Sequence, residues 1–293
     1  AQTRACGAEV ILHGESLDES RAHAETLVQS RGLTLIHPYD DPLVIAGQGT
    51  VALEMLDAFP HLDALVAPVG GGGLLGGMSV AARALNPKIE LYGVQTRGYS
   101  AMAEVLRGGP AGTGGPTIAE GIAVKRPGKL TVPLLEANVT DILLVDEGDL
   151  EDALLLLLEV EKTVSEGAGA ASLAAVLRHR DVFAGKQVGI VLSGGNIDPM
   201  VMAAVIERGM VRTGRLARIR VEIRDLPGSL SDVTEIIGNA NANIEQVFHQ
   251  RAFTHLPLQT AEVDFVIRTR GREHINDVLA ALAASGYHAQ VLD

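Results

Sequence analysis

Four consecutive glycines, Gly70–Gly73, are the residues of this sequence best suited to bind an anion. Glycine has no side chain to cover its backbone N–H group, so four in a row can present several donors to one ligand. A helix that starts at about Leu74 would add the positive end of its dipole. A simple turn does not need four glycines, each of which costs conformational entropy. The spacing therefore favours a binding site for a phosphate group.

Two nucleotide motifs are weaker explanations of the same glycines. Gly71-x-Gly73-x-x-Gly76 matches the dinucleotide fingerprint, but that motif needs an acidic residue near the end of the next strand, where this sequence has Gln95. A P-loop needs a Lys-Ser or Lys-Thr pair after its glycines, and none follows here. The loop alone therefore leaves the phosphate-bearing group open.

A second glycine-rich turn, Ser193-Gly194-Gly195-Asn196, follows a predicted strand at 187–192. A predicted strand at 64–69 leads into Gly70 in the same way. Because ligands of parallel sheets bind beyond the carboxyl ends of the strands, we expect the two turns to share one cleft.

The elements that must position these turns alternate between strand and helix. Strands are predicted at 8–12, 33–36, 64–69, 89–95, 140–145 and 187–192, and helices at 44–59, 74–85, 149–163, 170–178 and 199–210. This order predicts an α/β fold with a doubly wound, mostly parallel sheet. The later strands (217–222, 244–250, 261–268, 287–292) and helices (229–238, 271–285) follow the βαββαβ order of a small ferredoxin-like α+β domain. We therefore expect domains at 1–212 and 217–293.

Composition excludes several classes of partner. The 293 residues carry a net charge of −12 and are 47% hydrophobic, a balance typical of a globular protein. An acidic chain with no basic run does not suit nucleic acid or acidic membranes, and no apolar stretch reaches membrane-spanning length. Cys6 alone can form no internal disulfide, which favours a reducing compartment such as the cytoplasm.

Several longer motifs occur in a fixed order along the chain. They are Ile36-His37-Pro38-Tyr39-Asp40-Asp41-Pro42, Ala46-Gly47-Gln48-Gly49-Thr50, Pro68-Val69-Gly70-Gly71-Gly72-Gly73-Leu74, Ala119-Glu120-Gly121-Ile122-Ala123-Val124, Glu166-Gly167-Ala168-Gly169 and Leu192-Ser193-Gly194-Gly195-Asn196-Ile197-Asp198. Together they resemble the threonine dehydratase (threonine ammonia-lyase) family, pyridoxal-phosphate enzymes of the tryptophan-synthase-β fold type, over about residues 1–212. The segments Asp225-x-Pro227-Gly228-x-Leu230 and Ala242-Asn243-Ile244 resemble an ACT regulatory domain.

The resemblance implies pyridoxal 5'-phosphate as the cofactor. The glycine loop would hold its phosphate, and the Ser193 hydroxyl would meet the pyridine nitrogen. A neutral hydroxyl leaves that nitrogen largely unprotonated, which favours elimination over transamination. Gly121 would pack beside the ring, and Glu166 would lie near its polar edge. The implied cofactor-binding residues are Gly70, Gly71, Gly72, Gly73, Leu74, Gly121, Glu166 and Ser193.

The implied reaction is the elimination of water from L-threonine, and by extension from L-serine, which yields a 2-oxo acid and ammonia. Two alternatives stay open: a serine racemase or serine dehydratase of the same fold, and a non-catalytic amino-acid-binding fragment. The ACT-like segment favours the dehydratase, because effector control suits the entry to isoleucine biosynthesis.

The family's Schiff-base lysine lies in a Ser-x-Lys-x-Arg-Gly-Ala segment upstream of the glycine loop, and this sequence contains no such segment. The sequence also starts without Met. Its first residues, Ala1–Cys6, are typical of the end of a helix. We therefore expect a catalytic domain truncated at its N-terminus, with residues 1–40 a remnant of the smaller lobe. The chain would then contain no catalytic residue and would be inactive alone.

No metal site is expected. Family members that bind a divalent cation use carboxylates after the strand at 89–95, whereas this sequence has Gln95 and Ala101 there. Hard cations prefer anionic oxygen ligands, and Glu104 nearby is typical of a solvated helix residue.

The ACT-like domain predicts an effector site at a domain–domain interface. Asp225, Gly228 and Asn243 would meet the ammonium and carboxylate of an amino acid, with isoleucine or valine expected. The alternative is a domain used only for assembly. The resemblance also implies a homo-oligomer, either a dimer or a tetramer.

Overall fold

The structure is a computed structural model that describes residues 2–15, 17–110, 114–250 and 257–292. Its internal contacts divide the chain into two compact units. The first contains Ala1–Gly115, Ile122–Leu144 and Phe183–Val191, and the second contains Pro116–Gly121, Val145–Val182 and Leu192–Asp293. The domain limits expected from the sequence remain predictions.

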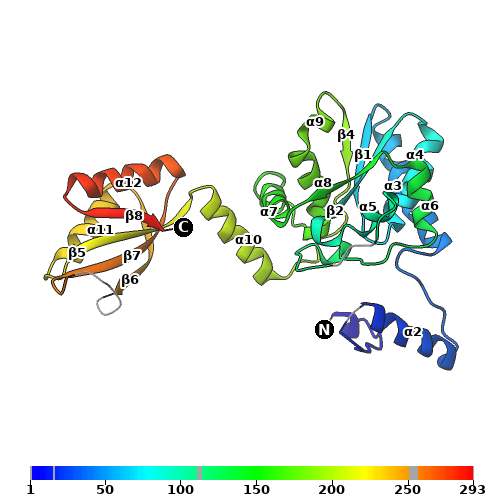
Figure 1. Cartoon of the computed structure of the whole chain (residues 1–293), viewed down its shortest axis with the longest axis horizontal. Coiled ribbons are helices and arrows are strands. Elements are labelled where there is room, and N and C mark those ends of the chain that lie inside the picture. Colours follow the sequence, from blue (N-terminus) through cyan, green and yellow to red (C-terminus); the bar gives the residue numbers. More distant parts are fainter. Residues whose placement is uncertain (1, 16, 111–113, 251–256, 293) are drawn as a thin grey trace. The chain divides into compact units, whose positions relative to one another are not determined.

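A four-stranded sheet with the order β3-β2-β1-β4 forms the centre of the first unit (Figure 1). Its strands are β1 (Ala64–Pro68), β2 (Glu90–Thr96), β3 (Asp141–Val145) and β4 (Val188–Ile190). The central strand β1 runs parallel to both of its neighbours, β2 and β4. Every residue of β1 is buried, as expected for a strand covered on both faces. The predicted α/β fold with a mostly parallel sheet is therefore confirmed.

The helices of the first unit are α1 (Gln2–Ala5), α2 (Leu17–Arg31), α3 (Pro42–Ala58), α4 (Gly73–Leu85), α5 (Ala101–Leu106) and α6 (Thr131–Asn138), with a 3₁₀ turn at Arg97–Tyr99. Helix α4 packs against both α3 and α6. α3 begins two residues earlier than predicted, because the Asp41 carboxylate accepts the N–H groups of Leu43 and Val44 at 2.8 and 3.0 Å. Pro42 occupies its first turn, where the missing N–H costs nothing.

Two predicted strands, at 8–12 and 33–36, are wrong. Both segments are irregular, and Leu12 and Ile36 are 85% and 73% exposed. A strand needs a neighbouring strand to pair its N–H and C=O groups, and within the described residues none pairs with either segment. The strand predicted at 187–192 does form, but only as the shorter β4.

The second unit begins with α7 (Glu147–Leu156), which the side chains of Asp146 and Asp149 cap reciprocally. The helix predicted at 149–163 is interrupted, because a π-helical turn at Leu157–Glu161 follows and Lys162 ends it with a φ of 55°. Next come α8 (Gly167–Arg178), α9 (Arg180–Phe183), which crosses into the first unit, and α10 (Pro199–Arg212); a 3₁₀ turn lies at Glu120–Ile122. In the part of the chain that the structure describes, no helix has the length and apolarity needed to cross a bilayer.

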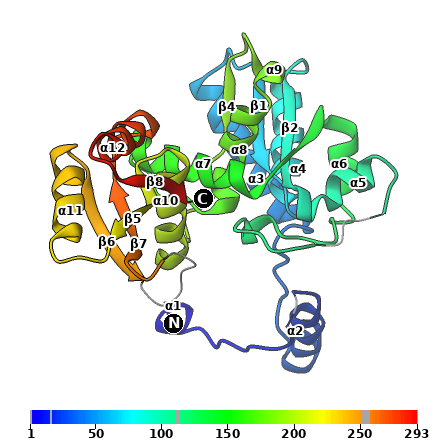
Figure 2. The same cartoon turned by 60° about the vertical axis from the view of Figure 1, so that its left-hand side comes forward.

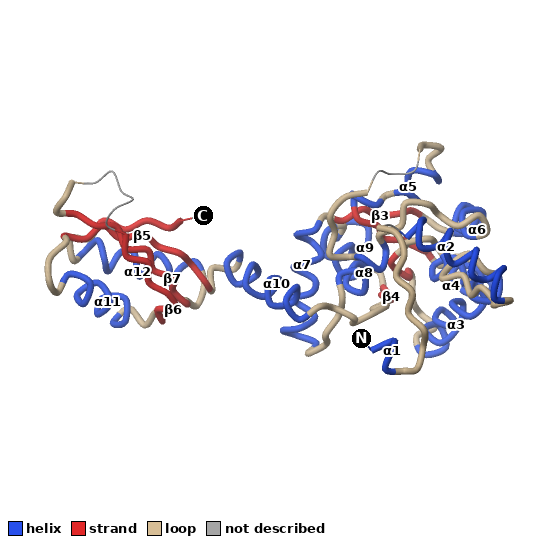
Figure 3. Tube along the Cα trace, turned by 90° about the horizontal axis from the view of Figure 1, so that it is seen from below, coloured by secondary structure: helices blue, strands red, loops and turns tan. Residues whose placement is uncertain are grey.

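The C-terminal residues form a second four-stranded sheet with the order β6-β7-β5-β8. Its elements are β5 (Leu216–Arg224), α11 (Ser229–Asn239), β6 (Asn243–Gln250), β7 (Thr260–Arg268), α12 (Arg272–Ala284) and β8 (His288–Leu292). β5 pairs antiparallel with β7 and β8, and β6 with β7. Helices α11 and α12 lie on one face of this sheet and share one apolar core with it (Figures 2 and 3). The predicted ferredoxin-like domain is therefore confirmed.

Asp264 on β7 is a buried carboxylate that two arginines of β5 hold. It is 1% exposed and accepts hydrogen bonds from Arg220 Nε and Arg218 Nη2, each at 2.7 Å. The hydrogen bond from Arg220, reinforced by Arg218, holds the pKa of the Asp264 carboxyl below its usual range, although burial opposes this shift. A lowered pKa in the folded state stabilises the fold above the unfolded-state pKa of about 3.9.

We expect Asp264→Asn to lower the free energy of unfolding at pH 7 by about 1–3 kcal/mol, because the two guanidinium groups lose a charged acceptor. The deficit should begin to shrink as the pH falls below about 4, where the carboxyl of the unfolded chain takes up a proton, and it should disappear only below the lowered pKa of the folded Asp264 carboxyl. Urea titrations at pH 7 and at low pH measure both effects. Glu245→Gln is the matched control, since its pair with Arg268 lies on the surface and should contribute under about 1 kcal/mol. Equal deficits for Asp264→Asn at both pH values would contradict this account.

Candidate functional site

The glycine loop, Gly70–Gly73, joins the carboxyl end of the central strand β1 to helix α4. Just before it, the N–H of Val69 still donates to the Val94 carbonyl of β2 at 2.8 Å. Gly72 directly precedes α4 and has a φ of 98°, in the left-handed region that favours glycine. The loop therefore lies at the positive end of a 13-residue helix, as its sequence predicts.

The backbone N–H groups of this loop have no acceptor among the described residues of the protein. Hydrogen bonding along α4 starts with Gly76, whose N–H donates to the Gly72 carbonyl at 2.8 Å. Gly71, Gly72 and Gly73 are buried, and buried N–H groups without a partner are rare in folded proteins. A phosphate group offers enough acceptor oxygens to pair several of these donors at once. The loop therefore fits a phosphate-bearing ligand.

Residues 127–131, which are more than 50 positions later in the sequence, lie against the glycine loop. The Gly71 carbonyl accepts hydrogen bonds from the Thr131 hydroxyl at 2.6 Å and from the Gly128 N–H at 3.0 Å. Sequence reasoning gave neither residue a role. The spacing of residues in the turn before α6 gives no sign that this turn meets the glycine loop. Only the folded chain reveals this contact.

Tyr39 also packs on the glycine loop. A Cβ atom at Gly71 would collide with the Tyr39 ring, and one at Gly73 would lie 2.8 Å from the Tyr39 Cα. The Tyr39 hydroxyl donates to the Arg126 carbonyl at 3.1 Å, which ties the two segments together. Glycines at these positions therefore also allow the close approach of another chain segment.

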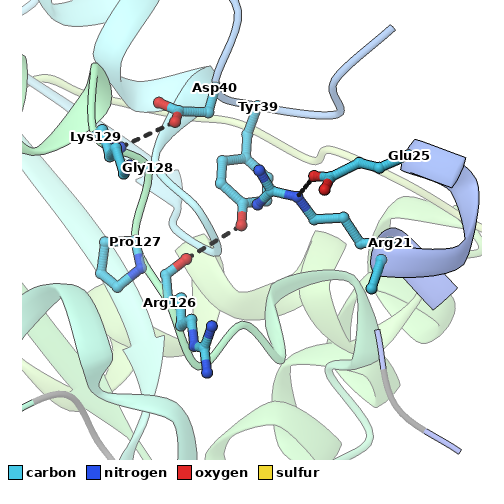
Figure 4. A pocket seen from close by; sticks show the side chains of 9 residues that line it. Arg21, Glu25, Tyr39, Asp40, Arg126, Pro127, Gly128 and Lys129 are labelled. Carbon is cyan, nitrogen blue, oxygen red and sulfur yellow. Dashed lines mark hydrogen bonds and ion pairs between the residues drawn. The ribbon is translucent and has the colours of Figure 1, made fainter. Parts of the chain in front are cut away.

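A polar cavity of about 420 Å³ lies beside this contact (Figure 4). Its wall includes Arg21 and Glu25 of α2, which pair at 3.2 Å, and residues of the 126–129 segment. Tyr39 points between these two walls, and the Asp40 carboxylate accepts the N–H of Lys129 at 3.0 Å (Figure 4). The charged groups of Arg21, Glu25 and Asp40 thus have partners within the protein.

In the second unit, Glu166 brings together three segments that the sequence assigned to the site. Its N–H donates to the Gly194 carbonyl at 3.0 Å, next to Ser193. Its carboxylate oxygen Oε1 lies 3.3 Å from the place that a Cβ on Gly121 would occupy, and a Cβ on Gly194 would collide with it. Ser193 itself is exposed. Glu166, Gly121 and the Ser193–Gly194 peptide therefore form one group, positioned by the start of α8.

Gln95 and Glu104, which the sequence related to a metal site, make hydrogen bonds within the protein. The fully buried Gln95 amide donates to the Val69 carbonyl at 3.2 Å and accepts the Ala103 N–H at 2.9 Å, so it links β2 to α5 and to the residue that follows β1. Glu104 accepts the Ser100 hydroxyl at 2.5 Å. Within the described ranges, no group of three or more His, Cys, Asp or Glu residues is arranged to hold a metal ion.

The three predicted effector residues are exposed but lie at opposite ends of one sheet. Asp225 and Gly228 follow the end of β5, where Arg224 is paired with Thr260 of β7. Asn243 starts β6 and is paired with Arg268, which also pairs with Leu216 at the beginning of β5. The structure therefore does not bring these residues together within a single domain.

Comparison with known families gives two matches along the chain. A family model described as "Pyridoxal-phosphate dependent enzyme" matches residues 1–194, and an "ACT domain" model matches residues 217–286. A protein named L-threonine ammonia-lyase from Thermotoga maritima is 41% identical over 293 residues, which are 99% of this chain and 73% of that protein.

Solved structures of related enzymes align with about two thirds of the chain. A T.th. threonine deaminase aligns with a TM-score of 0.63 and 40% identity, and the match covers 67% of this chain and 65% of that one. A serine racemase from Dictyostelium discoideum aligns with a TM-score of 0.60 and 36% identity, over 66% of this chain and 62% of that one. The chain thus spans less than two thirds of the length of either solved protein.

Proposed function

The chain belongs to the pyridoxal-phosphate dependent enzyme family, and on that premise we propose that the native protein to which these residues belong converts L-threonine to a 2-oxo acid and ammonia. The observation that carries this proposal is its similarity, over nearly its whole length, to a protein named L-threonine ammonia-lyase. The ACT match in the same chain supports a regulated form of that activity. The family's cofactor, pyridoxal 5'-phosphate, agrees with the phosphate-binding character of the glycine loop.

Each site residue then has a defined task. The N–H groups of Gly70–Gly73 and Leu74 bind the cofactor phosphate at the positive end of α4. The Ser193 hydroxyl meets the pyridine nitrogen as a neutral partner, and Gly121 leaves room beside the ring because it has no side chain. Glu166 holds the Gly194 backbone and lies against Gly121. The bound cofactor supplies a conjugated ring that withdraws electrons from the substrate's α-carbon.

The test uses the native protein. We expect it to release a 2-oxo acid and ammonia in equal amounts from L-threonine, and to show a visible absorbance band that shifts when threonine is added. Intact mass is measured on the same sample. A mass matching the 293 residues, with neither a band nor turnover, would contradict the enzyme and favour a non-catalytic amino-acid-binding fragment.

Serine racemase or serine dehydratase activity is the second candidate, which the similarity to a serine racemase structure supports. Turnover of L-threonine and L-serine is compared at equal concentrations, and D-serine is measured by chiral chromatography. D-serine as the main product would identify a serine racemase. Exclusive turnover of L-serine to a 2-oxo acid and ammonia would identify a serine dehydratase.

Regulation and assembly form the remaining part of the proposal. Asp225 and Gly228 lie far along the sheet from Asn243, so a single effector site built from all three needs two ACT domains side by side. A homo-oligomer, dimer or tetramer, supplies the second domain, and isoleucine or valine is the expected effector. We place this protein in the cytoplasm, since Cys6 is its single cysteine.

A further inference from the structure

The Thr131 hydroxyl lies behind the glycine loop, and Thr131 is fully buried. Its Oγ1 is 2.6 Å from the Gly71 carbonyl oxygen and 3.2 Å from the Gly128 carbonyl oxygen. A hydroxyl has one proton to donate, and the shorter distance assigns that proton to Gly71. The Gly71 carbonyl therefore has two donors, the Thr131 hydroxyl and the Gly128 N–H.

Asp40 fixes the segment that carries these two donors. Its carboxylate accepts the N–H of Lys129 at 3.0 Å and the N–H of Leu130 at 2.8 Å, directly before the first residue of α6 (Figure 4). A carboxylate at a helix start pairs N–H groups that have no partner within the helix. A Cβ on Gly128 would lie 2.5 Å from the Asp40 Oδ1 and 2.7 Å from the Thr131 Oγ1. The Asp40 carboxylate, the Gly128 backbone and the Thr131 hydroxyl thus pack closely together, and we call these three groups the support of the glycine loop.

Fixing the Gly71 carbonyl also fixes the Gly72 N–H, because both belong to one planar trans peptide and point in opposite directions. The N–H of Gly72 therefore points away from Thr131, and it has no protein acceptor among the described residues. A hydrogen bond to the carbonyl of a peptide also polarises its N–H into a stronger donor. The support consequently determines both the direction of the Gly72 N–H and its strength as one of the hydrogen-bond donors of the glycine loop.

We propose that Thr131, anchored through Asp40, is a positioning residue that presets the Gly71–Gly72 peptide for the phosphate of the cofactor. This inference rests on the proposed cofactor role of the glycine loop and adds a residue outside every motif of that site. Thr131 touches neither substrate nor cofactor in this role. It acts through one peptide group, so its effect should be specific to ligands that carry a phosphate.

The test compares two ligands that bind without forming a bond to the protein: pyridoxamine 5'-phosphate and pyridoxamine. Isothermal titration with the full chain measures both dissociation constants for wild type, Thr131→Val and Thr131→Ser. Valine keeps the shape of threonine but has no hydroxyl, and serine keeps the hydroxyl. We expect Thr131→Val to weaken pyridoxamine 5'-phosphate binding about tenfold, as the loss of one oriented hydrogen bond to a charged group predicts. Pyridoxamine binding should not change, and Thr131→Ser should retain wild-type affinity within about twofold.

Asp40→Asn gives a second route if Thr131→Val does not fold, which circular dichroism would reveal. It weakens the anchor while leaving Thr131 intact, and we expect a smaller loss, about threefold, again confined to the phosphate-bearing ligand. Equal losses for both ligands, or no loss in either variant, would overturn the positioning role while the cofactor site stands. If the wild-type chain bound the two ligands equally well, the phosphate-binding role of the glycine loop would be wrong, and this inference would fail with it.

Discussion

Gly72→Ala should weaken binding of pyridoxamine 5'-phosphate by about 100-fold and lower the free energy of unfolding by about 2–4 kcal/mol. Gly72 has a φ of 98°, where an L side chain costs about 1–2 kcal/mol. A Cβ there would lie 2.7 Å from the Met102 Cε and 2.8 Å from the Thr131 Oγ1. The peptide must move to relieve these contacts, and the N–H groups on either side then lose their common direction. Two misaligned bonds to a charged phosphate account for the expected loss of affinity.

Gly76→Ala, in the first turn of the helix that follows Gly72, is the matched control. A Cβ at Gly76 would meet its nearest neighbour, Leu135 Cδ1, at 3.4 Å, which is ordinary van der Waals contact. This variant should therefore bind pyridoxamine 5'-phosphate within about threefold of wild type and gain up to about 1 kcal/mol from the better helix propensity of alanine. Isothermal titration and urea unfolding measure the two variants in parallel. Similar losses of affinity in both would show that helix α4, rather than the backbone of the loop, determines phosphate binding.

Gly77→Ala is expected to cost about 3 kcal/mol of the free energy of unfolding, because α3 and α4 cross there with their backbones in contact. A Cβ at Gly77 would collide with the Ile45 carbonyl oxygen and lie 2.7 Å from the Gly49 nitrogen. These are backbone atoms that cannot rotate away, so the two helices must separate. Separation also shifts the start of α4, and we expect weaker phosphate binding together with the loss of stability. Urea unfolding followed by circular dichroism measures the first effect.

Gly47→Ala provides the control for helix propensity within the same pair of helices. A Cβ at Gly47 would have no neighbour within 4 Å. Alanine there should stabilise α3 by about 0.5–1 kcal/mol, since glycine is the poorer helix former. If Gly77→Ala were as stable as Gly47→Ala, the close crossing of α3 and α4 would not exist in solution.

Local sequence was enough to predict the structure of the glycine loop and the class of both sheets. The apolar run Ala64–Pro68, the glycines and the helix after them make a strand, turn and helix from neighbouring residues alone. Alternating strands and helices likewise predicted the parallel sheet, and the βαββαβ order predicted the C-terminal domain. Such patterns are readable because they depend on residues a few positions apart.

By contrast, contacts between residues that are far apart in the sequence can be seen only in the folded chain. The segments at 8–12 and 33–36 have the apolar composition of strands, yet they form none, because a strand exists only where a second strand pairs with it. The support of the glycine loop is of the same kind: Thr131 and Gly128 reach the Gly71 carbonyl through the packing of α6 on α4, which no local spacing records. Asn243 and Asp225 are a second case, because the register of β5, β6 and β7 places them at opposite ends of one sheet, which their positions in the sequence do not reveal. Local chemistry thus follows from the order of residues, whereas the partner of each buried polar group follows only from the fold.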